Sequence, residues 1–271
     1  MRDMERLKTT ASLLLILWLT SCNKMDLEII TPDVTTLGIK APVKKYETSS
    51  DGTFNMTYSK ENKLMSVTLD KTSKWGIYKW ETKQEPLTFI YTYDDREGFI
   101  RKDYYQNFIL NKNGCATSFE VVMICNGNGL KDETTTKYSM EYDDENRLTS
   151  MKSVDSDGLT YVVYYTWSSS GELAEWNKIG KNPDKHQFVY NGLRNTDGLF
   201  IELQMGILPQ APFLFFGGLL GSPSSMLPCK DDNDGFEWKI EYNRSSGHVI
   251  SETSSFYVGG ELIDVTNKYG Y

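Results

Sequence analysis

Few side chains in this sequence have the chemistry of a catalytic site. The chain of 271 residues contains only two histidines and four cysteines. His186 follows the turn-forming stretch 182–184, and His248 follows the stretch 245–247, so we expect both side chains in exposed loops. A nucleophilic serine or cysteine needs an adjacent base. The sequence therefore predicts no catalytic residue, and a hydrolase is the least favoured function.

The acidic residues form two patterns that suggest chemistry but have a simpler explanation. The aspartate pairs 94–95 and 143–144 are adjacent in predicted strands, so their side chains point to opposite faces and cannot act as a glycosidase pair. The stretches 155–158, 195–198 and 232–235 match part of a calcium loop, but the first ligand position of the second and third is Leu193 or Lys230, which cannot bind calcium, and no bidentate glutamate is placed correctly across all three. Asp-Gly pairs are typical of type I′ hairpin turns. We predict turns there, no metal site and no cofactor.

The N-terminal segment has the pattern of an export signal. Basic residues within 1–10 precede the apolar run 11–19, which is shorter than the ~20 residues that a membrane span needs. The run ends in Leu-Thr-Ser-Cys at 19–22, which resembles the lipobox of bacterial lipoproteins. The resemblance implies cleavage before Cys22 and lipidation of its sulfur and its new amino terminus. We predict an outer-membrane lipoprotein on the periplasmic or the cell-surface face.

Three cysteines remain after lipidation, namely Cys115, Cys125 and Cys229. Because three is an odd number, at least one thiol stays free or pairs with another molecule. Cys115 and Cys125 lie ten residues apart and could face each other across adjacent strands. An exported chain can form a disulfide, so the sequence leaves both a bond and free thiols open.

The charge of the chain narrows the classes of partner. The formal net charge is -8, and it becomes -9 when residues 1–21, with three basic and two acidic side chains, are removed. An acidic surface repels nucleic acid and anionic lipid. We expect no nucleic-acid partner, and we expect the membrane to be contacted through the lipid anchor. We also expect a monomer.

The body of the chain repeats one pattern that places these residues on β-hairpins. Two or three alternating aromatic or apolar residues are followed by a polar stretch rich in Asp, Asn, Gly and Ser, and then by Leu or Val. Alternation is typical of a strand with one buried face, and the polar stretch is typical of a tight turn. The clearest copy runs from Tyr138 to Met151, and further copies begin at Phe54, Phe89, Val163, Phe188, Trp238 and, in degenerate form, Phe108.

These repeats resemble two families. Residues 142–149 are similar to one YD repeat of bacterial shell proteins, although YD arrays are long and regular. The lipobox, the aromatic hairpins and the late segment 218–228 together resemble a Bacteroidota-type family of secreted lipoproteins of unknown function with a porin-like β fold. The resemblance implies an all-β, antiparallel meander of hairpins that forms a strongly curved or barrel-like sheet, and it implies no activity.

The chain divides on this basis into three parts. They are a signal peptide at 1–21, a lipidated N-terminus and tether at 22–50, and a single β domain at 51–271. The segments 119–125 and 161–167 could pass as outer-membrane strands. An inserted pore is nevertheless disfavoured, because the predicted strand 139–143 has one wholly polar face and looks soluble, and because lipidation routes proteins differently from inserted barrels. The apolar stretch 205–220 contains two prolines and several glycines, so we expect an irregular plug on the concave side of the sheet.

The predicted function is that of a non-enzymatic envelope lipoprotein that binds a ligand or partner or has a structural role. The alternative is a glycan-binding surface module. Of the tryptophans in the β domain, Trp167, Trp176 and Trp238 occupy packing positions of the repeat. Trp75 and Trp80 lie in an irregular segment, and they are the candidates for stacking against a glycan or another envelope ligand.

Overall fold

The structure is a computed structural model, and it describes residues 42–48, 52–127, 129–200, 211–233, 235–243, 245–258 and 261–271, all within the unit Thr35–Tyr271. The predicted signal peptide, Cys22 and most of the predicted tether lie outside these residues. Sixteen strands and one short helix, α2, form within the described ranges. Their bounds are β1 Lys45–Thr48, β2 Gly52–Tyr58, β3 Leu64–Ser73, β4 Gly76–Gln84, β5 Leu87–Asp94, β6 Ile100–Leu110, β7 Ala116–Gly127, β8 Leu130–Tyr142, β9 Leu148–Asp155, β10 Thr160–Trp167, β11 Leu173–Gly180, β12 Asp184–Arg194, α2 Phe213–Phe216, β13 Met226–Asp231, β14 Glu237–Tyr242, β15 Val249–Val258 and β16 Glu261–Gly270.

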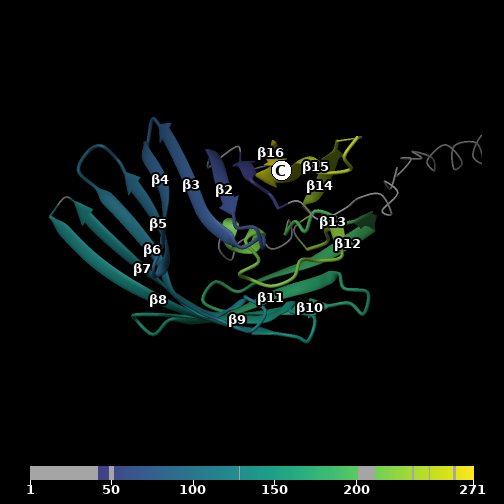
Figure 1. Ribbon diagram of the computed structural model, residues 1–271, viewed down its shortest axis with the longest axis horizontal. Coiled ribbons are helices and arrows are strands. Elements are labelled where there is room, and N and C mark those ends of the chain that lie inside the picture. Colours follow the sequence, from purple (N-terminus) through teal and green to yellow (C-terminus); the bar gives the residue numbers. More distant parts are fainter. Residues whose placement is uncertain are drawn as a thin grey trace, which may run out of the picture. The chain divides into compact units, whose positions relative to one another are not determined.

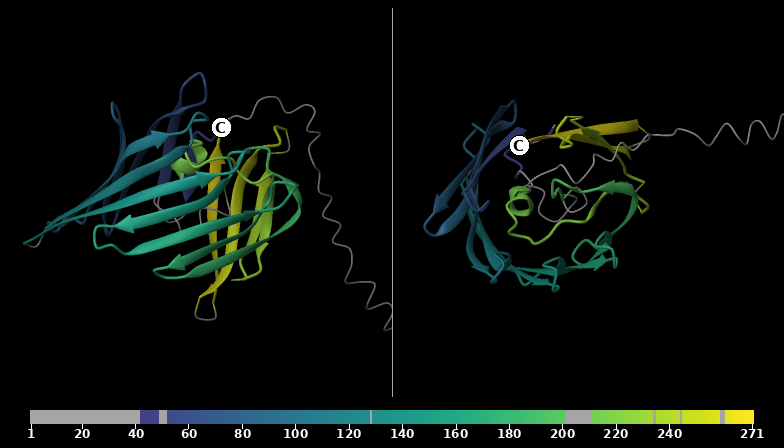
Figure 2. Two further views of the ribbon diagram at one scale, coloured as in Figure 1. Left: turned by 90° about the horizontal axis from the view of Figure 1, so that it is seen from below. Right: turned by 45° about the vertical axis from the view of Figure 1, so that its right-hand side comes forward.

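The strands form a closed antiparallel barrel (Figure 1). Each strand pairs with its neighbours in sequence, and β1 pairs with β16 to close the ring, with Tyr46 opposite Tyr269. Figure 2 shows the sheet curving round an interior that contains α2. The prediction of an all-β, barrel-like meander of hairpins is confirmed.

The barrel begins earlier in the chain than the predicted domain boundary. β1 lies within the segment 22–50 that the sequence assigned to the tether, yet it pairs with both β2 and β16. The strand is four residues long, so its alternation is too brief to stand out from a tether. Its Tyr46 is buried against Tyr269 and Phe216, which explains why this short strand belongs to the core.

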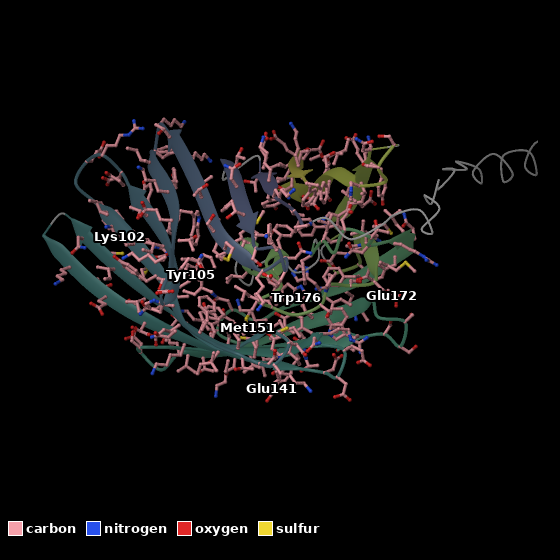
Figure 3. The ribbon with its side chains drawn as sticks, viewed as in Figure 1. Lys102, Tyr105, Glu141, Met151, Glu172 and Trp176 are labelled. Carbon is pink, nitrogen blue, oxygen red and sulfur yellow. The ribbon has the colours of Figure 1, made fainter. Side chains whose placement is uncertain are left out.

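The core inside the barrel is apolar, whereas the outer face carries both polar and exposed apolar side chains. On β8, Met140 is buried on the inner side, whereas Ser139 and Glu141 are exposed on the outer side. Figure 3 shows Met151 and Trp176 pointing into the barrel and Glu141 pointing away from it. Among the described residues, no helix is long and apolar enough to cross a membrane.

One end of the barrel is filled by the segment 211–225, which we call the plug. Its helix α2 is a single turn, and Phe213 packs on Trp80 and Phe89 with ring centroids 4.8 Å away in each case. The plug backbone also bonds the strand ends, since the Ala116 amide donates to the Leu219 carbonyl at 2.7 Å. The described part of the predicted plug, 211–220, therefore lies inside the curved sheet as expected. Residues 205–210 lie outside the described residues.

The aromatic repeat of the sequence marks the strand ends that surround the plug. In several copies the last aromatic residue donates a hydrogen bond to the carbonyl of the first residue of a neighbouring strand. Tyr142 donates to Ala116, Trp167 to Leu148 and Tyr190 to Leu173, at 2.7 to 2.8 Å. We call these three bonds the latches. They give the repeat a physical reason, because the same side chain packs on the core and joins neighbouring strands.

The turn at 155–158 differs from the predicted type I′ geometry. In the turn 155–159, the Gly158 amide donates to the Asp155 carbonyl, and Gly158 alone takes a positive φ, of 79°. A type I′ turn needs positive φ at both central residues, so the turn is of type I followed by a left-handed glycine. The Asp155 carboxylate accepts the Leu159 amide at 2.8 Å, which explains the aspartate at its first position.

Candidate functional site

The end of the barrel opposite the plug presents an accessible concave wall on strands β3 to β8. Residues directly opposite each other in an antiparallel ladder share a face, so the strand registers define rows of inward-facing side chains. One row near the open end, which we call the mouth row, consists of Lys71, Tyr78, Tyr93, Arg101, Cys125 and Asp132. The next row toward the plug consists of Leu69, Trp80, Tyr91, Asp103, Met123 and Thr134.

Burial falls along this wall from the plug to the mouth row. Phe89 and Tyr105, which lie next to the plug, are buried at 0% and 5% exposure. In the mouth row, Tyr78, Tyr93 and Arg101 are half-buried. Water and solutes can therefore reach the inner wall from the open end but meet a packed core at the plug.

An arginine is fixed on this wall by a buried carboxylate. Arg101 donates through Nε to Oδ1 of Asp103 at 2.8 Å and through Nη2 to Oδ2 at 2.7 Å. The Asp103 side chain is 2% exposed and that of Arg101 is 34% exposed. The hydrogen bonds from Arg101 to Asp103 raise the pKa of Arg101. The pair is a two-point contact that holds the guanidinium plane still, and its remaining nitrogen, Nη1, makes no hydrogen bond to the described residues.

Tyrosines flank this arginine. Tyr78 and Tyr93 are cross-strand partners, with ring centroids 5.0 Å apart. The Tyr93 hydroxyl donates to the Trp75 carbonyl at 2.8 Å, so the tip of the β3–β4 hairpin is tied to the wall. A Cβ on Gly76 would lie 2.6 Å from the Tyr93 ring, and Gly76 has a φ of 155°. Only glycine lets this ring pack against the hairpin tip.

The two tryptophans chosen from the sequence have opposite positions. Trp75 is 67% exposed at the hairpin tip, and the Lys74 ammonium lies 4.6 Å from its ring. Its ring is therefore accessible for stacking against a ligand. Trp80 is 3% exposed and packs on Tyr91 and Tyr105 inside the barrel. The expectation of a surface position for Trp80 is therefore wrong, because its strand parity points it into the core.

The histidines also differ from expectation. His186 lies on β12, 4% exposed, where its Nδ1 contacts the buried Asp231 and its ring packs at a tilt against Trp176, with ring centroids 4.2 Å apart. His248 is half-buried, and its Nδ1 lies 2.6 Å from Oδ1 of Asp197. The prediction of exposed loop histidines is thus wrong for His186. In both cases the carboxylate also accepts backbone amides, so each pair connects separate segments of the barrel.

The structure also places the three cysteines and the acidic loops of the described ranges. Cys115, Cys125 and Cys229 are free thiols. Cys115 directly precedes β7 and Cys125 lies near its far end, so the two thiols are separated by roughly 33 Å along one strand. Among the described residues, no cluster of three His, Cys, Asp or Glu side chains that could hold a metal ion occurs.

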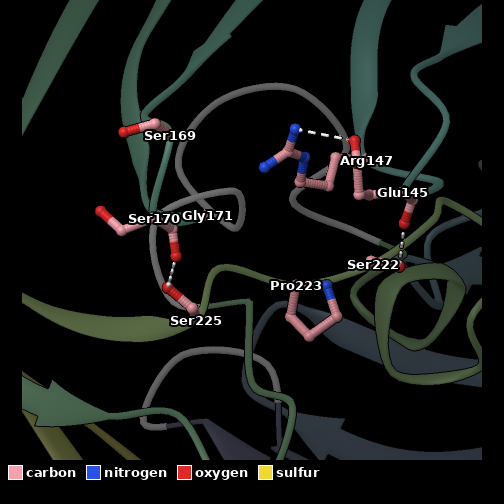
Figure 4. Close-up of a pocket in the computed structure, with 8 residues that line it drawn as sticks. All are labelled: Glu145, Arg147, Ser169, Ser170, Gly171, Ser222, Pro223 and Ser225. Atoms are coloured by element: carbon pink, nitrogen blue, oxygen red, sulfur yellow. Dashed lines mark hydrogen bonds and ion pairs between the residues drawn. The ribbon is translucent and has the colours of Figure 1, made fainter.

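A separate hollow lies at the plug end (Figure 4). It has a volume of about 370 Å³ and is lined by Glu145, Arg147, Ser169, Ser170, Gly171, Ser222, Pro223 and Ser225. Arg147 donates to Asp143 at 2.6 Å and to Glu145 at 3.1 Å. The Ser222 and Ser225 hydroxyls donate to the Glu145 and Ser170 carbonyls at 3.0 Å. These bonds fasten the plug to two turns, so we assign the hollow a structural role.

Solved structures with a similar fold were found for this chain. The chain is similar to the crystal structure of a porin-like protein from Bacteroides uniformis, with a TM-score of 0.58, 15% identity, and coverage of 86% of this chain and 98% of that one. The fold is porin-like. A porin-like protein from Bacteroides vulgatus also matches, with a TM-score of 0.49, 12% identity, and coverage of 85% and 99%. No protein-family model and no curated protein matches this chain at a significant level.

The residues of the concave wall were missed by sequence reasoning. Arg101, Asp103 and Tyr105 alternate along one strand and therefore share a face. Because Tyr105 is buried, that face is the inner one. The signal in the sequence that could have revealed the site was therefore the charged pair Arg101 and Asp103 on the same face as an aromatic residue. The partners Tyr78 and Tyr93 depend on the β4–β5 register, which is set by tertiary structure and cannot be read from either strand alone.

Proposed function

We propose that this chain is a non-enzymatic lipoprotein of the cell envelope that binds a ligand on the concave wall of its barrel. The observation that supports this most directly is the asymmetry of the interior. The plug fills one end, whereas at the other end a rigidly held arginine and several tyrosines remain within reach of solvent. Ligand sites are concave and combine apolar walls with a few fixed polar groups.

Anchoring at the outer membrane through Cys22 is part of this proposal, and it rests on the lipobox-like sequence at 19–22. Radiolabelled palmitate should label the wild-type chain but not a Cys22→Ala variant. Equal labelling of both would refute the anchor. Protease treatment of intact cells then distinguishes the two faces of the membrane, because only a surface-exposed barrel is cleaved.

Ligand binding is tested by hydrogen exchange of the mature chain with a panel of soluble probes: neutral oligosaccharides, acidic oligosaccharides, short peptides and fatty acids. The proposal expects at least one probe to slow exchange in β3 to β8 near the mouth row. Protection confined to other strands, or no protection by any probe, would contradict a binding role for this wall.

A glycan-binding surface module is the second candidate function. The exposed Trp75 favours it, because an aromatic ring at a hairpin tip offers a flat face to a sugar. A glycan array that compares the wild type with Trp75→Ala tests this role. Equal binding by both proteins would exclude Trp75, and no binding to any glycan would exclude the module.

A further inference from the structure

The mouth row supports a statement about the chemical class of the ligand, which rests on the binding role proposed above. Three kinds of group meet at this row within a few residues of one another. They are the aromatic pair Tyr78–Tyr93, the Arg101 guanidinium, and the exposed Trp75 at the adjoining hairpin tip. Tyr93 connects the three groups. It pairs with Tyr78, lies opposite Arg101 and donates a hydrogen bond to the Trp75 carbonyl.

The arginine offers directed hydrogen bonds without offering net charge. Its Nε and Nη2 are occupied by Asp103, which also neutralises it, and Nη1 is left to donate. The row contains two basic side chains, Lys71 and Arg101. Two acidic side chains balance their charge, namely Asp132 in the same row and Asp103 in the next row. A locally balanced site on a chain with a net charge of -8 does not attract an anion. It suits hydroxyl groups, which pair with fixed donors and acceptors.

The aromatic groups set the shape of the ligand. Tyr78 and Tyr93 are half-buried with an interplanar angle of 34°, and they offer ring faces rather than a closed slot. The Lys71 ammonium lies 5.6 Å from the Tyr78 ring. Ring faces next to fixed donors match a molecule with apolar C–H faces and hydroxyl edges. We propose that the mouth row binds a neutral oligosaccharide, with Tyr78 and Tyr93 as stacking residues and Arg101 as the hydrogen-bond donor.

The test is calorimetric titration of the mature chain with four neutral tetrasaccharides, namely the tetramers of maltose, cellulose, chitin and mannan type, and with tetragalacturonate. At least one neutral probe should bind, and tetragalacturonate should bind about tenfold more weakly or not at all. Tyr78→Ala should weaken the binding of the neutral probe by about tenfold, as expected when one ring contact is lost. Arg101→Lys keeps the charge beside Asp103 and should also weaken it.

The matched control is Tyr164→Ala, which removes an exposed tyrosine from the outer face of β10. It should bind the neutral probe as the wild type does. Unchanged affinity in both Tyr78→Ala and Arg101→Lys, with cooperative unfolding retained, would overturn the proposal. So would preference for tetragalacturonate, or binding of peptides or fatty acids alone, and these last outcomes would leave the broader binding role intact. If no probe slowed hydrogen exchange, both the oligosaccharide site and the broader binding role would be contradicted.

Discussion

At the scale of single residues, position along a strand decides what a side chain can do. Trp75 and Trp80 stand five positions apart, yet one is exposed and the other is packed against Phe213. The sequence identified both as aromatic residues of an irregular segment. The sequence alone does not show which of the two is buried. That depends on where β3 ends and β4 begins, because these bounds determine which positions of β4 point inward.

This difference predicts unequal effects on stability. Trp80→Ala should lower the free energy of unfolding by about 3–5 kcal/mol, because it empties a packed site in the core. Trp75→Ala should change it by less than about 0.5 kcal/mol, because the side chain is exposed. Urea denaturation measures both values. Equal effects of the two substitutions would contradict the burial of Trp80.

Glu252 is a second residue whose environment only the fold reveals. It lies 2% exposed on the inner face of β15, where it accepts hydrogen bonds from Tyr269 and Asn267 at 2.6 Å. Burial raises the pKa of Glu252 to about 6, above its ordinary value of 4.5. The protonated form is therefore favoured in the folded chain. Its contribution to stability is present at low pH and is lost as the pH rises through about 6.

We expect Glu252→Gln to remove this loss. Relative to the wild type, the variant should gain stability between pH 4.5 and about 6, reaching a gain of about 2 kcal/mol at neutral pH. Denaturation across this pH range gives the difference curve. Glu237→Gln on the exposed face of β14 serves as the control and should follow the wild type. A flat difference curve for Glu252→Gln would show that the carboxyl is not buried in this way.

At the scale of elements, the hairpin repeat could be recognised in the sequence because the last aromatic residue of a copy both packs on the core and joins neighbouring strands. Copies such as 138–151 and 163–176 were placed correctly from alternation and turn residues alone. The copy that begins at Phe188 was not completed as a hairpin, since β12 is followed by the plug and then by β13. The sequence carries one sign of this exception, because Leu199 follows Tyr190 by nine positions, whereas Leu148 follows Tyr142 by six. Local periodicity therefore predicts strands well but does not reveal the path of the chain between them.

The latches give a prediction for one element. Tyr142→Phe removes the hydroxyl that donates to the Ala116 carbonyl at 2.7 Å, and it leaves that carbonyl without this donor beside the core. We expect a loss of about 1–2 kcal/mol in the free energy of unfolding. Tyr164→Phe removes a hydroxyl from an exposed ring and should cost less than about 0.5 kcal/mol. Similar losses in the two variants would argue against the latch.

At the scale of the whole molecule, closure of the barrel depends on the shortest described strand. β1 covers the edges of both β2 and β16. An uncovered strand edge presents unpaired amides and carbonyls to other chains. A chain that begins at Gly52 lacks β1, and we expect it to associate or aggregate. A chain that begins at Pro42 keeps β1 and should remain a monomer.

Light scattering after size-exclusion chromatography distinguishes these outcomes. A stable monomer of the chain that begins at Gly52, with an unchanged unfolding midpoint, would show that β1 is dispensable for closure. Association of both chains would instead contradict the expectation that the protein is a monomer.

By itself the sequence determined the class of structure: strands, tight turns, a single inner face and an apolar plug. These features depend on alternation and turn chemistry, which act between residues close in the chain. Only the tertiary structure decided that the sheet closes, that β1 belongs to it, that Cys115 and Cys125 stand at opposite ends of one strand, and that Arg101 meets Tyr78 and Tyr93. Each of these depends on register between strands, and register is fixed by packing across the whole barrel.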